Sequence, residues 1–214
     1  MSPRPPLLVV ATRNPGKTRE LQALLAGFPV EVRDLGRFGP LPEVEEDGAS
    51  FEENAYKKSS FTARILGVPA LADDSGLCVA ALGGAPGVHS ARYGGPGLSD
   101  AERVARLLAA MKGRSDRRAS FVCVLSLAVP SGAALTYEGR CEGVIAEEPA
   151  GEMGFGYDPV FFYPPLGRTF AQLSAEEKHR VSHRGRAMAE LGAEFERVMR
   201  WIRNRMPPGD PWNP

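Results

Sequence analysis

The chain has 214 residues, of which 43% are apolar, and this is enough to build one hydrophobic core. Its 26 basic and 26 acidic residues cancel, which excludes a global field that would attract nucleic acid or an anionic membrane. No apolar stretch reaches the roughly 20 residues of a membrane span, and the Pro-rich start lacks the apolar core of a signal peptide, so we expect a cytoplasmic protein.

The first predicted elements are a buried strand at residues 7–11 and a helix that follows it at once. Asn14 and Pro15 suit the N-cap and first position of this helix, and Pro29 ends it. The stretch ATRNPGKT, residues 11–18, therefore lies on a strand-to-helix turn, where backbone amides favour anions. It departs from the P-loop pattern GxxxxGK[ST] at Ala11, where a glycine is required. An altered P-loop and a different triphosphate-binding device both remain open.

An acidic segment follows between two further predicted elements. Residues 30–33 favour a second strand, and Ser50 with Glu53 forms a capping box for a helix that Gly67 ends. The loop between them is rich in Gly and Pro and carries the acidic residues Glu43, Glu45, Glu46 and Asp47. These carboxylates supply oxygen ligands of the kind that Mg²⁺ prefers.

Two adjacent aspartates come next. A short predicted strand at residues 70–72 leads into Asp73-Asp74-Ser75-Gly76, a sequence in which local hydrogen bonding favours a turn. Paired carboxylates at a strand end also suit Mg²⁺, which proteins bind through one or two carboxylates, waters and substrate phosphates. The turn and the metal site are compatible, and residues 77–82 fit either a strand or a buried helix.

The second half of the chain predicts a β-meander between helices. Capping boxes begin helices at residues 99–102 and 174–177, and residues 185–205 have the spacing of one long amphipathic helix. Alternating apolar residues predict strands at 121–129, 134–137 and 142–146. This mixture favours an α/β class with a mixed sheet, as one two-lobed domain over residues 1–206. Residues 207–214 predict a disordered tail.

An aromatic loop and a cationic segment have both structural and functional interpretations. Phe155-Gly156-Tyr157-Asp158 can pack into the core, or it can offer a ring for stacking and a carboxylate for a nucleobase. His179 and His183 have the spacing of a helical zinc pair, but the HExxH glutamate is absent. The surrounding cations oppose a metal dication and favour phosphate or a base edge; they are Lys178, Arg180, Arg184 and Arg186.

The three cysteines carry no predicted site. Cys78, Cys123 and Cys141 are widely spaced and lie in apolar or strand-like runs. This pattern favours buried thiols over a disulfide framework or a zinc site.

Six motifs in one order resemble the inosine triphosphate pyrophosphatase family: ATRNPGK, SFEENAYKK, ALADDSGL, LGGAPGVHSARY, GFGYDPVF and EEKHRVSHRG. The resemblance implies a long mixed sheet flanked by helices, in two lobes with a nucleotide cleft between them, and a homodimer. It also implies Mg²⁺-dependent hydrolysis of the purine nucleoside triphosphates ITP, dITP and XTP to the monophosphate and pyrophosphate. Such an enzyme removes these nucleotides from the pool before they enter DNA or RNA.

The resemblance also implies the roles of individual residues. Asp74 is the expected general base, and Lys17 and Lys58 are expected to face the phosphates. The expected metal ligands are Asp74, Asp73 and one of Glu45 and Glu46, whose register stays open. The expected substrate-binding residues are Thr12, Arg13, Asn14, Pro15, Gly16, Lys17, Ser75, Phe155, Gly156, Tyr157, Asp158, Lys178, His183 and Arg184.

Three other functions remain possible alternatives from the sequence. A related hydrolase of different base choice would share the same motifs. A P-loop-like kinase or ATPase would release inorganic phosphate, although Ala11 counts against it. A nucleotide-binding module without activity would show no turnover.

Overall fold

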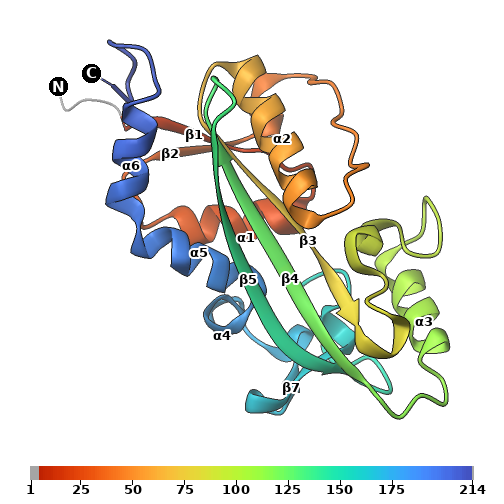
Figure 1. Ribbon diagram of the computed structural model, residues 1–214. Coiled ribbons are helices and arrows are strands. Elements are labelled where there is room, and N and C mark those ends of the chain that lie inside the picture. The colour runs from red at the N-terminus through yellow and green to blue at the C-terminus, as the bar shows by residue number, and fades with distance from the viewer. Residues whose placement is uncertain (1–4, 214) are drawn as a thin grey trace. The chain divides into compact units, whose positions relative to one another are not determined.

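The strands of the computed structural model, which describes residues 5–213, form one seven-stranded mixed sheet (Figure 1). The strand order is β2-β1-β3-β4-β5-β6-β7. The strands are β1 (Leu7–Val10), β2 (Glu31–Asp34), β3 (Ala70–Val79), β4 (Arg118–Ala128), β5 (Ala134–Ile145), β6 (Phe161–Tyr163) and β7 (Arg168–Thr169). The helices are α1 (Pro15–Leu25), α2 (Phe51–Leu66), α3 (Asp100–Ala110), α4 (Ala175–Val181), α5 (His183–Ala193) and α6 (Phe195–Arg203). The predicted α/β class with a mixed sheet is confirmed.

The chain divides into two compact units. The first unit comprises Met1–Asp74, Val124–Glu138 and Ala187–Pro214, and the second comprises Ser75–Cys123 and Gly139–Arg186. One boundary falls inside β3, so the first unit ends its longest segment at Asp74 and the second begins at Ser75. Within residues 5–213, every helix is too short or too polar to cross a membrane.

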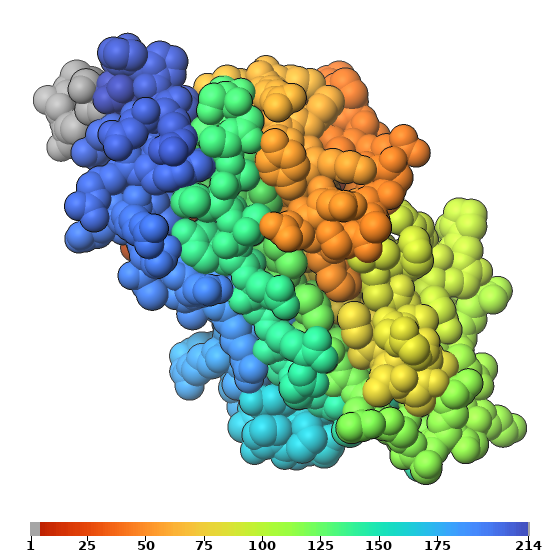
Figure 2. All heavy atoms as spheres, in the orientation of Figure 1, coloured from red at the N-terminus to blue at the C-terminus, as the bar shows by residue number. Residues whose placement is uncertain are grey.

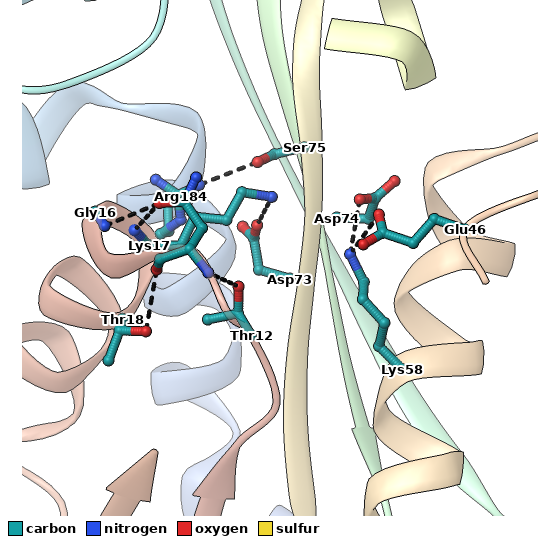
Figure 3. A network of polar contacts seen from close by, with 11 residues as sticks. Thr12, Gly16, Lys17, Thr18, Glu46, Lys58, Asp73, Asp74, Ser75 and Arg184 are labelled. Atoms are coloured by element: carbon teal, nitrogen blue, oxygen red, sulfur yellow. Dashed lines mark hydrogen bonds and ion pairs between the residues drawn. The ribbon is translucent and has the colours of Figure 1, made fainter. Parts of the chain in front are cut away.

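In the first unit, β1 pairs in parallel with β2 and with the start of β3. Helices α1 and α2 lie on opposite faces of β3 (Figure 3). Small buried side chains line the core between sheet and helix, among them Ala11, Ala63, Ala70, Ala72 and Ala128, and these let the backbones approach closely. Figure 2 shows the turn after β4 (green) beside α2 (orange), where the Tyr56 hydroxyl donates to the Gly132 carbonyl at 3.0 Å.

The second unit has an aromatic core. Phe121 stands in contact with Phe161 and Phe170, with ring centroids 4.6 and 5.8 Å away. Such aromatic pairs contribute about 0.5–1.5 kcal/mol each beyond the area that they bury. The antiparallel pairs β5 with β6 and β6 with β7 bring this part of the chain together.

The predicted helix starts are confirmed. The Asn14 side chain accepts from the amides of Gly16 and Lys17, which caps α1. Ser50 caps α2, and reciprocal capping boxes begin α3 and α4 at Ser99 and Ser174.

Three predicted elements differ in the structure. Strand β3 continues through residues 73–76, where the sequence favours a turn, and β5 is one strand where the sequence suggests two. The long helix predicted at residues 185–205 is interrupted at Glu194, whose ψ of 11° lies outside the helical region. At this break the rings of Phe28 and Phe195 pack with their centroids 4.3 Å apart, so a tertiary contact accompanies the change in direction.

The cysteines are free thiols, and the C-terminal segment contacts the start of β1. Cys123 and Cys141 are buried free thiols and Cys78 is half-buried. Residues 207–213 have defined contacts where the sequence predicts disorder, because Trp212 is buried and its indole Nε1 donates to the Leu7 carbonyl at 2.9 Å.

Candidate active site

Two adjacent aspartates of β3 point to opposite faces of the sheet (Figure 3). Because successive side chains of a strand alternate, Asp73 points toward α1 and Asp74 toward α2. Lys17 Nζ lies 2.5 Å from Asp73 Oδ1, and Lys58 Nζ lies 2.8 Å from Asp74 Oδ1. Each carboxylate therefore has its own lysine, and the pair does not converge on one point.

The turn before α1 is built by a side chain. Asn14 Oδ1 accepts from the Gly16 and Lys17 amides at 2.8 and 3.1 Å, and Thr12 Oγ1 accepts from the Asn14 amide at 3.2 Å. In a P-loop, a glycine-rich backbone leaves such amides for the phosphates. Here Asn14 caps them, so this turn is a different device, and it brings Lys17 to Asp73.

Pro15 and Arg13, two further predicted substrate-binding residues, also lie in this turn. Pro15 is the first residue of α1. Arg13 is exposed, and its guanidinium donates to the Leu41 carbonyl and lies 3.7 Å from Glu43. The contacts of the Arg13 guanidinium are therefore with the segment that carries the acidic residues.

Lys58 forms ion pairs with two carboxylates in a partly buried cluster. Its Nζ donates to Asp74 Oδ1 at 2.8 Å and to Glu46 Oε2 at 3.1 Å. Asp74 Oδ2 is buried and has no hydrogen-bond partner within the described chain. A buried carboxylate oxygen without a donor is unfavourable unless something binds it, so this atom marks a position for a ligand.

The cluster shifts the acidity of its members in different directions. Burial raises the pKa of Asp74, although the charges of Lys58 and Lys17 oppose it. Burial also acts to raise the pKa of Glu46, but Lys58 outweighs it and the pKa is lowered. The pKa of Lys58 is raised, because Asp74 and Glu46 outweigh its burial.

The structure separates the predicted metal-binding carboxylates. Glu46 reaches the cluster, whereas its neighbour Glu45 is exposed, and Asp73 lies on the other face of β3. The residues that could hold a metal together are therefore Glu46 and Asp74. No group of three or more histidine, cysteine, aspartate or glutamate side chains that could hold a metal ion occurs among residues 5–213.

In the second unit, a buried ion pair supports the aromatic loop. Lys178 Nζ lies 2.6 Å from Asp158 Oδ2, and the same oxygen accepts from the Phe155 amide at 2.8 Å. Lys178 Nζ also lies 4.9 Å from the centroid of the Phe155 ring. Tyr157 is buried in the aromatic core, as the structural interpretation expects, while Phe155 stays half-buried with its ring beside a cation.

Arg184 is a buried guanidinium beside that loop. Only 1% of the residue is exposed, its Nη2 donates to Ser75 Oγ at 3.0 Å, and its Cζ lies 5.8 Å from the Phe155 ring centroid. Phe155, Lys178, Ser75 and Arg184 therefore come together within one unit. Such a set offers a ring for stacking and donors for an electron-rich edge.

His179 and His183 do not form a helical zinc pair. Ser182, with ψ of 159°, ends α4, so His179 lies in α4 and His183 begins α5. The His183 ring stacks on Phe121 with 4.7 Å between centroids. Gly185 permits the close approach of the two helices, since a Cβ there would come 1.7 Å from the His179 carbonyl oxygen.

Sequence reasoning missed two residues that hold the aromatic loop. Asp100 Oδ2 accepts from the Gly156 amide at 2.8 Å, and the Tyr157 hydroxyl donates to the Ser90 carbonyl at 2.9 Å. Ser90 belongs to one of the six motifs, which was its only signal, and Asp100 is visible in the sequence only as a residue of the α3 capping segment.

Comparisons with known proteins identify the family of this chain. The model of the Ham1 family matches residues 8–194. A dITP/XTP pyrophosphatase of Syntrophobacter fumaroxidans is 65% identical over 199 residues, 93% of this chain and 86% of that protein. One of Desulfotalea psychrophila is 54% identical over 209 residues, 98% of this chain and 94% of that protein.

Solved structures give the same result. A HAM1 protein from Coxiella burnetii superposes with a TM-score of 0.82 at 43% identity, covering 90% of this chain and 99% of that one. The Ham1 protein of Staphylococcus aureus gives 0.81 at 42% identity, with the same coverage. The family resemblance carried by the six motifs is thereby confirmed: the chain belongs to the Ham1 family.

Proposed function

We propose that this chain is a nucleoside triphosphate pyrophosphatase that hydrolyses dITP, XTP and ITP to the monophosphate and pyrophosphate, and so removes them before incorporation into nucleic acid. The observation that carries the proposal is the partnerless buried Oδ2 of Asp74 beside Lys58 and Glu46. Relatives covering most of the chain are named dITP/XTP pyrophosphatases, which supports the substrate class. The homodimer and the cytoplasmic location stay predictions.

The donor set of the first unit fits Mg²⁺. Glu46 and Asp74 offer hard oxygen ligands, and the buried Asp74 Oδ2 is available to a cation. When bound, Mg²⁺ would offset phosphate charge as a Lewis acid. Glu45 and Asp73 are not included in this site, because Glu45 is exposed and Asp73 pairs with Lys17 on the other face of β3.

Asp74 is the proposed general base. Its carboxylate is buried, and Oδ2 has no hydrogen-bond donor within the described residues, so this oxygen has room to accept a proton from a bound water. The water oxygen bonds to the α-phosphorus, its proton passes to Asp74, and the bond from the α-phosphorus to the bridging oxygen breaks with release of pyrophosphate. Lys17 and Lys58 stabilise the negative charge that develops on phosphate oxygens.

Base selection is assigned to the residues around Phe155. Stacking on an aromatic ring contributes about 1–3 kcal/mol per base. Hypoxanthine and xanthine present an oxygen acceptor at the 6-position, which suits a guanidinium donor such as that of Arg184. Adenine presents an amino donor there. Two hydrogen-bond donors would then face each other, which weakens the binding free energy by about 1–3 kcal/mol. Lys178 and Asp158 hold the ring in place.

Product identification by phosphorus NMR tests the proposal. The protein with Mg²⁺ is incubated separately with dITP, XTP and ITP, and with ATP and GTP as controls. We expect monophosphate and pyrophosphate, formed far faster from the first three. Asp74→Asn should abolish turnover and retain nucleotide binding, whereas Asp116→Asn, in a surface ion pair with Arg118, should leave turnover unchanged.

Other products would contradict the proposal. Orthophosphate and a diphosphate would indicate a P-loop-like hydrolase, and absence of any turnover would indicate a binding module. Turnover of Asp74→Asn near that of the wild type would remove Asp74 from its role.

A further inference from the structure

The segment of residues 43–49, here called the acidic loop, is fastened to α2 by a series of contacts in register. The Ala49 amide donates to Glu53 Oε2 at 2.7 Å and the Gly48 amide donates to Asn54 Oδ1 at 2.8 Å. Next along the loop, Asp47 pairs with Lys57 at 2.5 Å and Glu46 with Lys58 at 3.1 Å. Residue numbers fall along the loop as they rise along the helix, so the loop runs antiparallel to α2 and ends this series at Glu46.

The four helix residues share one face of α2. Positions 53 and 57, and positions 54 and 58, are each four apart and therefore neighbours on the helix surface. Asp47 is exposed and Lys57 is half-buried, and an ion pair at the surface contributes only about 0–1 kcal/mol. Asn54 is fully buried, and its bond to Gly48 is the buried contact of the series. Asn54 therefore provides the firmest attachment of the loop.

Gly48 fits closely against Asn54. A Cβ at this position would come 2.6 Å from Asn54 Oδ1 and 2.9 Å from the Glu53 Cβ. The backbone of the loop can reach the amide oxygen only because residue 48 has no side chain. The contact thus depends on both residues, one on the helix and one on the loop.

We infer that Asn54 is the positioning residue of the metal site: by accepting from the Gly48 amide it holds Glu46, two residues away, beside Asp74. Figure 3 shows Glu46 extending from its loop toward Asp74 and Lys58. Loss of the Asn54 oxygen frees the loop backbone, and Glu46 then spends less time at the site. The inference rests on the proposed Mg²⁺ site, and it adds the residue on which the geometry of that site depends.

Three substitutions distinguish this role from a general contribution to stability. Asn54→Leu removes the acceptor and keeps a branched side chain, while Asn54→Asp keeps an oxygen acceptor and replaces Nδ2, which has no partner in the described part of the chain, by a second carboxyl oxygen at a fully buried position. Gly48→Ala disturbs the same contact from the loop side and leaves the helix intact. Ser59→Ala is the matched control, because Ser59 is a fully buried residue of the same helix whose hydroxyl bonds to Ser126 at 2.8 Å and not to the loop.

The first measurement is the affinity of the full chain for Mn²⁺, used as a probe for Mg²⁺, by electron paramagnetic resonance without nucleotide. Loss of a supporting contact around a metal ligand typically weakens metal affinity by about 10–100-fold. We expect at least a tenfold loss in Asn54→Leu and Gly48→Ala, a smaller loss in Asn54→Asp, which keeps the acceptor but buries a carboxyl group, and near wild-type affinity in Ser59→Ala. Hydrogen exchange of residues 46–49 should be faster in the first two variants only.

The outcomes separate the inference from the proposed function. If Asn54→Leu and Gly48→Ala bind Mn²⁺ as tightly as Ser59→Ala does, Asn54 is not the positioning residue, although the metal site stands. If the wild type itself binds no Mn²⁺ and its activity does not depend on a divalent cation, the metal site is wrong and the inference falls with it. Should Asn54→Leu fail to fold, Gly48→Ala, which leaves the helix residue unchanged, tests the inference.

Discussion

Among single residues, Arg184 is the one to which the proposed function assigns the choice of base. Its guanidinium is enclosed beside Phe155 and held by Ser75. Arg184→Ala should lower the ratio of kcat/KM for ITP over ATP by roughly 5- to 150-fold, since an unmatched donor facing the adenine amino group costs about 1–3 kcal/mol. Steady-state kinetics with both nucleotides measure this ratio.

The control for this prediction is Arg180→Ala. Arg180 is an exposed arginine of α4 that pairs with Glu176 on the same helix, so its loss should leave the ratio unchanged. A variant Arg184→Ala that loses activity equally toward both nucleotides would assign Arg184 to phosphate binding or to folding, and not to the choice of base.

Residue types in the sequence indicate much of this site, but not the course of the loops. Lys17, Lys58 and Asp74 are found from motif order, and the structure brings them to β3. The choice between Glu45 and Glu46 requires the path of the acidic loop, because adjacent residues of equal chemistry differ only in where the backbone turns them. Asn54 lies in the motif SFEENAYKK, but its role was not predictable from that, because it depends on a contact with a backbone amide of the loop.

At the scale of elements, α1 depends on its cap. Asn14→Ala removes the acceptor of two backbone amides, which should lower the free energy of unfolding by about 1 kcal/mol and raise the KM for nucleotide, because Lys17 lies in the first turn. Urea denaturation and steady-state kinetics measure the two effects. Asn14→Asp, which can still cap the helix, should recover the stability. Equal stability of Asn14→Ala and the wild type would show that the cap is dispensable.

Strand β3 shows where local sequence preference is overruled. Asp73-Asp74-Ser75-Gly76 favours a turn by itself, yet the strand passes through it. On one face Asp73 meets Lys17, and on the other Asp74 meets Lys58, and an extended backbone is what places both carboxylates. Helix starts were predictable because a cap is a local device. The course of this strand was not predictable, because the lysines that its aspartates contact lie in α1 and α2.

At the scale of the whole molecule, segments far apart in the sequence build each unit. The first unit combines residues 1–74 with residues 124–138 and 187–214, so its integrity depends on contacts of high sequence separation. One of these joins the two ends of the described chain. The Trp212 indole donates to the Leu7 carbonyl at the start of β1, and Asn213 donates to the Met206 carbonyl after α6. Since β1 leads directly into the turn that carries Asn14 and Lys17, this attachment supports the strand that precedes the residues proposed to bind phosphate.

The C-terminal attachment should therefore contribute measurably to stability. Replacing a buried tryptophan by alanine typically costs about 3–5 kcal/mol, and in a chain of this size each kcal/mol shifts the midpoint by about 2–4 °C, so Trp212→Ala should lower the thermal midpoint by roughly 6 °C or more. Trp212→Phe, which keeps an aromatic ring and loses the Nε1 donor, should cost only about 1 kcal/mol. Trp201→Ala serves as the control, because Trp201 is half-buried on α6 and its ring stands against the Arg205 guanidinium. If calorimetry gives Trp212→Ala the midpoint of the wild type, the tail contributes nothing to the fold, and the disorder that the sequence predicts for residues 207–214 is the better description.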